Sequence, residues 1–388
     1  MNAFAIPLLL LGQNEWMPTI QAIDGRFRAV AHDANHAFAT DRRWTGSTNV
    51  YSGDAGIVLF YRELYEIDHR NTLARDEALG GGRRLAAATF KSSNPSLYMG
   101  ISGEGYVLSL LSSDWLRNVA DHAADQVAGI PARGGDIISG DAGAIIFLCY
   151  AHGFLGDPAF VASAERKAER LKPGLLDYSM PGFSHGTAGV AYAFACLYER
   201  TGKQEWLTEA KRGGEYLCSL MNADGLIPHT KGRDLYYLGW CHGPCGTGRL
   251  FLKLGTLTKD PQWLAAAERS AAAIMASGIP DRLTAGYWNN YGQCCGAAGV
   301  GEYFLELFHV TGKREYWHFA VKMGRHIVAN ATSCQGGVEW VHAEHNANRS
   351  NVAAQLNYSQ GSAGIGVFLL HLYQTEQGKI YLRFVDKR

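Results

Sequence analysis

A short Gly-x-x-Gly element, each time followed directly by an apolar run, recurs seven times along the chain of 388 residues. The elements stand 40 to 65 residues apart and begin at Gly53, Gly100, Gly140, Gly186, Gly243, Gly296 and Gly361. Self-similarity at such a period is typical of repeat architectures, in which each unit buries its apolar face against its neighbours. The chain is therefore expected to fold as seven stacked units.

Each unit contains two expected helices of different character. In the first helix, apolar residues surround most of the circumference, which predicts burial on most faces. The clearest of these runs follow Gly56, Gly143, Gly189 and Gly299. A turn and a more polar, amphipathic helix come next, in the stretches that begin at Thr201, Leu257 and Thr311. Tryptophans near the same point of this second helix are expected to pack it on its partner: Trp206, Trp263 and Trp317.

Buried first helices and half-exposed second helices predict an all-α fold with an inner and an outer layer. An open superhelix is one way to stack such units, but enclosure of the buried layer favours an α/α toroid, a double barrel of seven inner and seven outer helices. Strand signals are sparse. Residues 46–388 are expected to form the toroid, and residues 1–45 to pack on it or cap it, as a lid or as an outer helix.

Composition excludes some classes of function. The 36 basic and 36 acidic residues give no net charge, which argues against a broad nucleic-acid surface. The apolar start, Met1–Gly12, lacks the basic residues of a signal peptide, so we expect a buried first segment. No other apolar run reaches the length of a membrane span. The eight cysteines are scattered, which favours reduced thiols in a cytoplasmic protein.

The glycines let the chain turn tightly and let inner helices crowd together at one end of a barrel. Residues just before each first glycine should then share that end, which we call the mouth. They are Ser52, Met99, Ser139, His185, His242, Cys295 and Gln360.

Three cysteines near this end have the pattern of a metal site. Cys241 lies two residues before Gly243, and Cys294 and Cys295 directly precede their own loop glycine. Thiolates from separate loops suit zinc, and three protein ligands leave a fourth position in which a substrate thiol would lose its proton. The plainer alternative is a set of ordinary buried thiols. Cys245 is expected to pack in the core, and His242 is a rival ligand.

Other polar residues near the mouth have alternative interpretations. His185 is a candidate acid or base, and Asp136 a carboxylate that would orient it or bind substrate, although a helix cap or surface role is equally simple. Asp54 and Asp141 share one repeat position, which favours structural capping. In the polar stretch 342–351, His342 and His345 are expected to be surface residues.

Together these residues resemble the lanthionine synthetase C-like (LanC-like) family. The resemblance is carried by Trp-Cys-His-Gly at 240–243, Cys-Cys-Gly at 294–296, Ser-His-Gly-x-Ala-Gly at 184–189 and the sevenfold glycine repeat. It implies an α/α toroid with one zinc ion at its open end. It also implies an enzyme that adds a peptide cysteine thiol to dehydroalanine or dehydrobutyrine, forming thioether rings.

Residue by residue, the resemblance matches Cys241, Cys294 and Cys295 to the zinc ligands. His185 matches the histidine that moves protons, and Asp136 an aspartate that assists it. Many members have Cys-His-Gly at the second cysteine segment, and the all-cysteine set resembles a subset of cyclases.

Stand-alone cyclases often carry an arginine four residues before the first zinc cysteine, where this chain has Tyr237. Animal LanC-like proteins also lack it and resemble enzymes that add glutathione to dehydroamino acids in proteins. Tyr237 and His242 are therefore candidate substrate-binding residues.

The expected partners are a dehydrated precursor peptide, or a protein containing dehydroamino acids, and a separate dehydrating enzyme. The first alternative function is the addition of glutathione or another small thiol to dehydroamino acids. The second is a non-catalytic, zinc-containing scaffold that binds peptides. A toroidal glycosidase would need paired carboxylates at the mouth, where this chain has cysteines.

Overall fold

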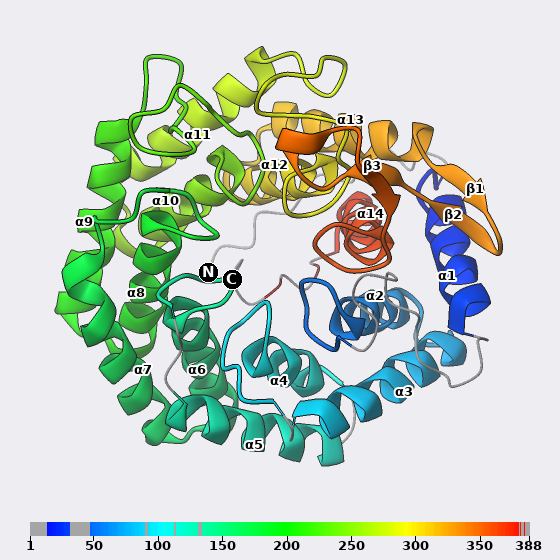
Figure 1. The fold of residues 1–388 in the computed structure, drawn as a ribbon, viewed down its shortest axis with the longest axis horizontal. Coiled ribbons are helices and arrows are strands. Elements are labelled where there is room, and N and C mark those ends of the chain that lie inside the picture. The colour runs from blue at the N-terminus through cyan, green and yellow to red at the C-terminus, as the bar shows by residue number, and fades with distance from the viewer. Residues whose placement is uncertain are drawn as a thin grey trace.

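The computed structural model describes residues 14–31, 47–89, 92–111, 114–130, 134–379, 381 and 384. The first segment, Met1–Gly12, lies outside these residues. Two concentric rings of helices make up the described chain (Figure 1), as the sequence predicted. The inner ring consists of α2 (Asp54–Ile67), α4 (Ile101–Ser109), α6 (Asp141–Leu155), α8 (Thr187–Thr201), α10 (Pro244–Thr258), α12 (Ala297–Thr311) and α14 (Ser362–Glu376).

The outer ring alternates with the inner ring along the chain. It contains α3 (Thr72–Thr89), α5 (Asp114–Gly129), α7 (Pro158–Leu171), α9 (Gln204–Leu220), α11 (Pro261–Ala276) and α13 (Arg314–Ala329). Helix α1 (Met17–Ala31) comes first in the sequence but packs against α14, so it lies beside the last inner helix (Figure 1). Since α14 also packs against α2, the inner ring is closed. None of the described helices combines the length and apolar character that crossing a bilayer requires.

The two layers follow from the two helix patterns. In α8 every residue from Thr187 to Leu197 is buried, whereas α9 buries one stripe and exposes the opposite face. The three tryptophans of the outer helices are buried and contact aromatic rings of their inner partners. The centroid distances are 5.7 Å for Trp206–Phe194, 6.2 Å for Trp263–Phe251 and 5.9 Å for Trp317–Phe308. The predicted packing role of these residues is confirmed.

The second glycine of the repeat is required by a close approach of the backbone. A Cβ atom on Gly246 would lie 2.0 Å from the carbonyl oxygen of Trp240, and one on Gly299 would lie 2.0 Å from that of Gln293. Both distances are far below van der Waals contact. These two inner helices therefore begin with their first turn folded tightly onto the loop that precedes them.

The seven loops before the inner helices are joined in a closed circle of backbone hydrogen bonds, which we call the loop ring. The bonds run from the Tyr51 amide to the Tyr98 carbonyl (2.9 Å), from Tyr98 to Ile138 (3.2 Å), from Ile137 to Ser184 (3.3 Å), from Ser184 to Cys241 (2.9 Å), from Cys241 to Cys294 (3.1 Å), from Cys294 to Ser359 (2.9 Å) and from Ser359 to Tyr51 (3.2 Å). The loops thus share one end of the toroid, the mouth.

The longest repeat spacing accommodates two small antiparallel hairpins between α13 and α14. Strand β1 (Thr332–Cys334) pairs with β2 (Gly337–Glu339), and β3 (Val341–Ala343) pairs with β4 (Val352–Ala354). Short 3-10 turns occur at Lys172–Gly174 and Asn346–Asn348. The sequence pattern missed these strands because each is only three residues long.

One of these strands corrects the expectation that His342 is a surface residue. Neighbouring side chains on a strand point to opposite faces, so Val341 is exposed while the His342 side chain is buried, with 1% of its surface accessible. Its ring packs against Tyr291. His345, which follows the strand, is exposed as predicted.

The aspartates of the first and third repeats are structural, but not as helix caps. The cap residues are Gly53 and Gly140, and Asp54 and Asp141 are the first residues of α2 and α6. Asp141 accepts hydrogen bonds from Lys167 (3.0 Å) and Arg170 (2.8 Å) of the outer helix α7. The Asp141 carboxylate therefore ties the start of an inner helix to its outer partner.

Replacement of Gly246 by Ala is expected to lower the free energy of unfolding by about 1–3 kcal/mol, because the added methyl group overlaps the Trp240 carbonyl. Gly255→Ala in the same helix is the control. Its Cβ would lie 3.6 Å from its nearest neighbour, Trp263, so stability should be kept or slightly raised. Denaturant unfolding measures both. Equal stability of the two variants would contradict the close-approach explanation.

Candidate functional site

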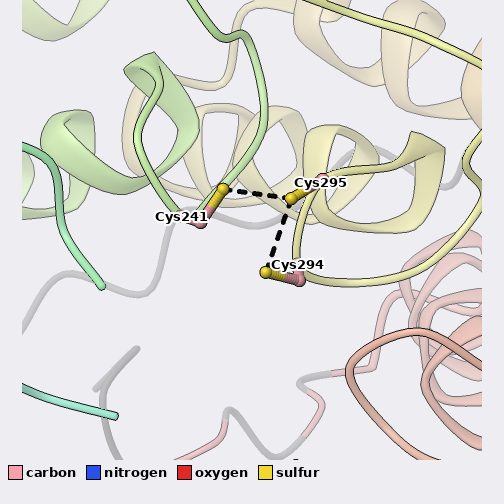
Figure 2. Close-up of side chains that lie close together, drawn as sticks. All are labelled: Cys241, Cys294 and Cys295. Atoms are coloured by element: carbon pink, nitrogen blue, oxygen red, sulfur yellow. Dashed lines mark hydrogen bonds between the residues drawn. The ribbon is translucent and has the colours of Figure 1, made fainter. Parts of the chain in front are cut away.

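Three cysteine sulfurs converge from two adjacent loops at the mouth (Figure 2). Cys241 Sγ lies 3.1 Å from Cys295 Sγ, which lies 3.6 Å from Cys294 Sγ. All three sulfurs are within 4.8 Å of one another, and all three residues are buried. None of the cysteines forms a disulfide in the structure. The arrangement brings together the three residues that the sequence singled out.

The sulfur positions fit a tetrahedral thiolate site. Sulfurs bonded at about 2.3 Å to a common tetrahedral centre would be about 3.8 Å apart, close to the spacing found here. The loops approach this closely because Gly239 has no side chain. A Cβ there would lie 2.7 Å from the Cα atom of Cys295. The residues present therefore suit zinc, with Cys241, Cys294 and Cys295 as the ligands that would hold it.

Two rival ligands are not part of the cluster. The group of potential ligand atoms that converge in the described chain contains the three cysteines, without Cys245 or His242. The Cys245 thiol donates a hydrogen bond to the Leu238 carbonyl (2.9 Å), so it has the packing role predicted for it. His242 is buried against the rings of His185 and His229.

The three thiols share their protons unequally. Hydrogen bonds from Cys241 and Cys295, and a further one from Tyr51, lower the pKa of Cys294 well below its ordinary value, although burial raises it. The same hydrogen bonding raises the pKa of Cys295, with burial adding to the effect. Cys294 is therefore the position at which negative charge first gathers in the cluster.

His185 and Asp136 form a hydrogen-bonded pair on the next two loops of the ring. His185 Nδ1 lies 2.8 Å from Asp136 Oδ2. Burial disfavours the charged ring, but the hydrogen bond and negative charge of Asp136, followed by the charge of Cys294, outweigh it and raise the pKa of His185. Asp136 also accepts the Ser139 backbone N–H at 2.7 Å. Its pKa falls because these bonds outweigh burial.

Aromatic rings pack around His242, the neighbour of Cys241 in sequence. The His242 ring centroid is 5.6 Å from that of His185 and 4.4 Å from that of His229. Burial, and then the neighbouring histidines, lower the pKa of His242 to about 3, so the ring is neutral. Tyr237 packs between His229 (4.4 Å) and Trp288 (5.1 Å). Both candidate substrate-binding residues thus lie in one aromatic cluster beside the sulfurs.

A family model described as lanthionine synthetase C-like protein matches residues 45–334. The chain belongs to this family. Among solved structures, nisin cyclase superposes with a TM-score of 0.67 at 14% identity, covering 93% of each chain. The resemblance stated from the cysteine, histidine and glycine patterns is confirmed.

Other toroids of similar shape carry different names. The GH76A α-1,6-mannanase from Salegentibacter sp. HEL1_6 matches with a TM-score of 0.52 at 14% identity, covering 93% of this chain and 99% of that one. A sugar epimerase from a ruminal bacterium matches with a TM-score of 0.52 at 12% identity, covering 93% of this chain and 98% of that one. At these identities the likeness extends to the fold alone, so the site must be argued from its residues.

Sequence reasoning missed two polar residues of this LanC-like site, Tyr51 and Asn290, and listed Gln360 only as a residue that precedes a loop glycine. Tyr51 Oη lies 3.8 Å from Cys294 Sγ. Gln360 donates a hydrogen bond to Tyr51, and Asn290 donates one to Gln360. The repeat register contained a signal for Tyr51. It stands two residues before its loop glycine, as Cys241 and Cys294 do. The predicted list of mouth residues contains only the position directly before each glycine, and therefore not Tyr51.

Replacement of Cys295 by Ala is expected to remove most of the bound zinc, because it deletes one of three converging sulfurs. The loss of affinity should exceed the about 10–100-fold loss typical of outer-shell partners. Cys245→Ser is the matched control and should keep the zinc, since its side chain bonds to Leu238. Metal analysis after dialysis against a weak chelator measures both. Equal zinc contents in the two variants would count against the cluster as the binding site.

Asp136→Asn is expected to lower the pKa of His185, which NMR titration of the ring protons measures. The folded-state pKa lies above that of an unfolded chain, so charged His185 stabilises the fold fully below about pH 6.5. This contribution is lost as the pH rises through the raised pKa. Asp136→Asn should therefore cost more stability at pH 6 than at pH 9, by less than about 1 kcal/mol, because the pair is partly exposed. An unchanged His185 pKa would contradict the pairing.

Proposed function

We propose that this protein is a zinc-dependent lanthionine cyclase, which adds a cysteine thiol to dehydroalanine or dehydrobutyrine in a dehydrated precursor peptide. The observation that carries the proposal is the position of the three sulfurs beside the His185–Asp136 pair on neighbouring loops. Membership of the LanC-like family supports the type of reaction. A separate dehydrating enzyme would supply the substrate.

The reaction rearranges atoms without losing any. The thiol gives up its proton, a bond forms between sulfur and the β-carbon, and the α-carbon gains a proton. Zinc held by Cys241, Cys294 and Cys295 would lower the pKa of the substrate thiol. The protein must also supply a proton to the α-carbon and exclude competing nucleophiles.

His185 is suited to move the proton. Asp136 occupies Nδ1, which leaves Nε2 for exchange with the substrate. The raised pKa favours a charged ring near neutral pH, so His185 can donate to the α-carbon. The neutral ring can then take a proton from the next thiol, which restores the starting state. The uncharged rings of His242 and Tyr237 form an aromatic wall against which a peptide segment can lie.

The decisive assay combines the zinc-loaded protein with a dehydrated peptide that contains one cysteine. Ring formation keeps the peptide mass and removes one free thiol, which alkylation followed by mass spectrometry detects. His185→Gln should lower the turnover rate by about 100- to 10,000-fold while zinc is retained. His345→Gln is the control, because that side chain is 78% exposed. Unchanged free thiol with zinc-loaded wild-type protein would count against cyclisation.

The same assay separates the alternative functions. A small-thiol transferase would add the mass of glutathione to a dehydrated peptide that lacks cysteine. Tyr237 favours this second candidate, because an uncharged residue stands where stand-alone cyclases often carry an arginine. A non-catalytic, peptide-binding scaffold would leave every dehydrated substrate unchanged.

A further inference from the structure

A chain of buried hydrogen bonds leads from the β3 backbone to the sulfur of Cys294. Asn290 and Gln360 form its middle, and each is only 1% exposed. Tyr51 is its last member and belongs to the first repeat, whereas Gln360 belongs to the seventh. The chain therefore spans the point at which the toroid closes. The donor and acceptor atoms of these side chains allow the hydrogen bonds to run in one direction only.

The direction is fixed first at Asn290. The backbone N–H of Gly292 can only donate, and it lies 2.9 Å from one side-chain atom of Asn290, which must be the oxygen Oδ1. The amide nitrogen Nδ2 then faces the Ala343 carbonyl at 2.8 Å, which can only accept. Rotating the amide by half a turn would place donor against donor and acceptor against acceptor. Two backbone groups thus set the orientation of Asn290.

The orientation of Asn290 sets the orientation of Gln360, which in turn sets the direction of the Tyr51 hydroxyl. Asn290 Nδ2 donates to Gln360 Oε1 at 2.9 Å, so Gln360 Nε2 is the atom that faces Tyr51 Oη at 3.3 Å. An amide nitrogen only donates, and the phenol oxygen must accept this bond. The single hydroxyl proton of Tyr51 is therefore not used in the bond with Gln360, and it is donated to Cys294 Sγ at 3.8 Å.

We propose that Tyr51 is a positioning residue whose hydroxyl group donates a hydrogen bond to the metal-bound thiolate of Cys294. Asn290 and Gln360 set the direction of this hydrogen bond. The proposal rests on the zinc site proposed above, and it adds a role that the ligand set alone does not contain. Three thiolates carry one more negative charge than a divalent ion neutralises, and a substrate thiolate adds another. Tyr51 is the protein group that shares this charge at one of the sulfurs.

The repeat register agrees with this assignment. Tyr51, Cys241 and Cys294 all stand two residues before their loop glycine, and each is a member of the loop ring. The backbone of Cys294 donates to Ser359, and Ser359 donates to Tyr51. The residues that carry the phenol and the sulfur are therefore held by the same backbone circle.

Cobalt substitution tests the proposal without any substrate. The thiolate-to-cobalt charge-transfer band reports the energy of the sulfur lone pairs, and a hydrogen bond to sulfur moves it to shorter wavelength. Tyr51→Phe should move the band to longer wavelength and weaken metal binding by about 10-fold. Tyr291→Phe is the matched control, because its ring packs on His326 and His342 away from the sulfurs. It should leave the band unchanged.

Two variants of Gln360 test the direction of donation. Gln360→Glu offers the Tyr51 proton a carboxylate and should shift the band as Tyr51→Phe does. Gln360→Met offers only a weakly accepting thioether and should leave the band near its wild-type position. In the double variant Tyr51→Phe/Gln360→Glu, the second change should add no shift. These variants also keep the test valid if Tyr51→Phe fails to fold.

An unshifted band in cobalt-loaded Tyr51→Phe would overturn the proposal, as would a full Gln360→Glu shift that persists in the Tyr51→Phe background. Either result leaves the cyclase function untouched, because no turnover is measured. Conversely, the expected shifts in a protein that closes no ring would refute cyclisation alone. A wild-type protein without any cobalt–thiolate band would overturn both.

Discussion

The loop ring is the constraint on which the rest of the structure depends. Seven loops are joined through backbone amides and carbonyls, which every residue except proline provides in full. The side chains in these loops are therefore free to vary, and they range from tyrosine to serine and cysteine. The glycines are not free, because the following helix turn lies against the loop backbone. In each loop, the backbone and the glycines thus hold the fold, and the other side chains are available for chemistry.

This division explains how residues more than a hundred positions apart form one site. The ring bonds Ser184 to Cys241 and Cys241 to Cys294, so each loop has a fixed neighbour. His185 follows Ser184 in sequence, and its ring stacks on that of His242, which follows Cys241. Adjacent repeats therefore place adjacent functional groups, and the order of the site around the mouth is the order of the repeats along the chain.

Much of this was predictable from sequence because the repeat is local and strong. The helices, the tryptophan contacts and the meeting of Cys241 with Cys294 and Cys295 all follow from a pattern read seven times. The buried position of His342 was not predictable, since it depends on a three-residue strand and its partner. The ion pairs of Asp141 also depend on how the next helix packs, because their partners lie 26 and 29 residues further along the chain. The register marks the position of Tyr51, but its contacts with Cys294 and Gln360 were not predictable, because they form only where repeat one meets repeats six and seven.

Two neighbouring histidines at the mouth differ in how readily they take a proton, because the pKa of His185 is raised and that of His242 is lowered. His185 and His242 stack, and two charged rings at that distance would repel each other. Asp136 favours the charge on His185, whereas burial and the neighbouring histidines keep His242 neutral. The positive ring therefore lies on the side of the carboxylate, and the neutral ring on the side of Tyr237. A substrate at the sulfurs would lie near a histidine that favours a proton and near the uncharged aromatic rings of His242 and Tyr237.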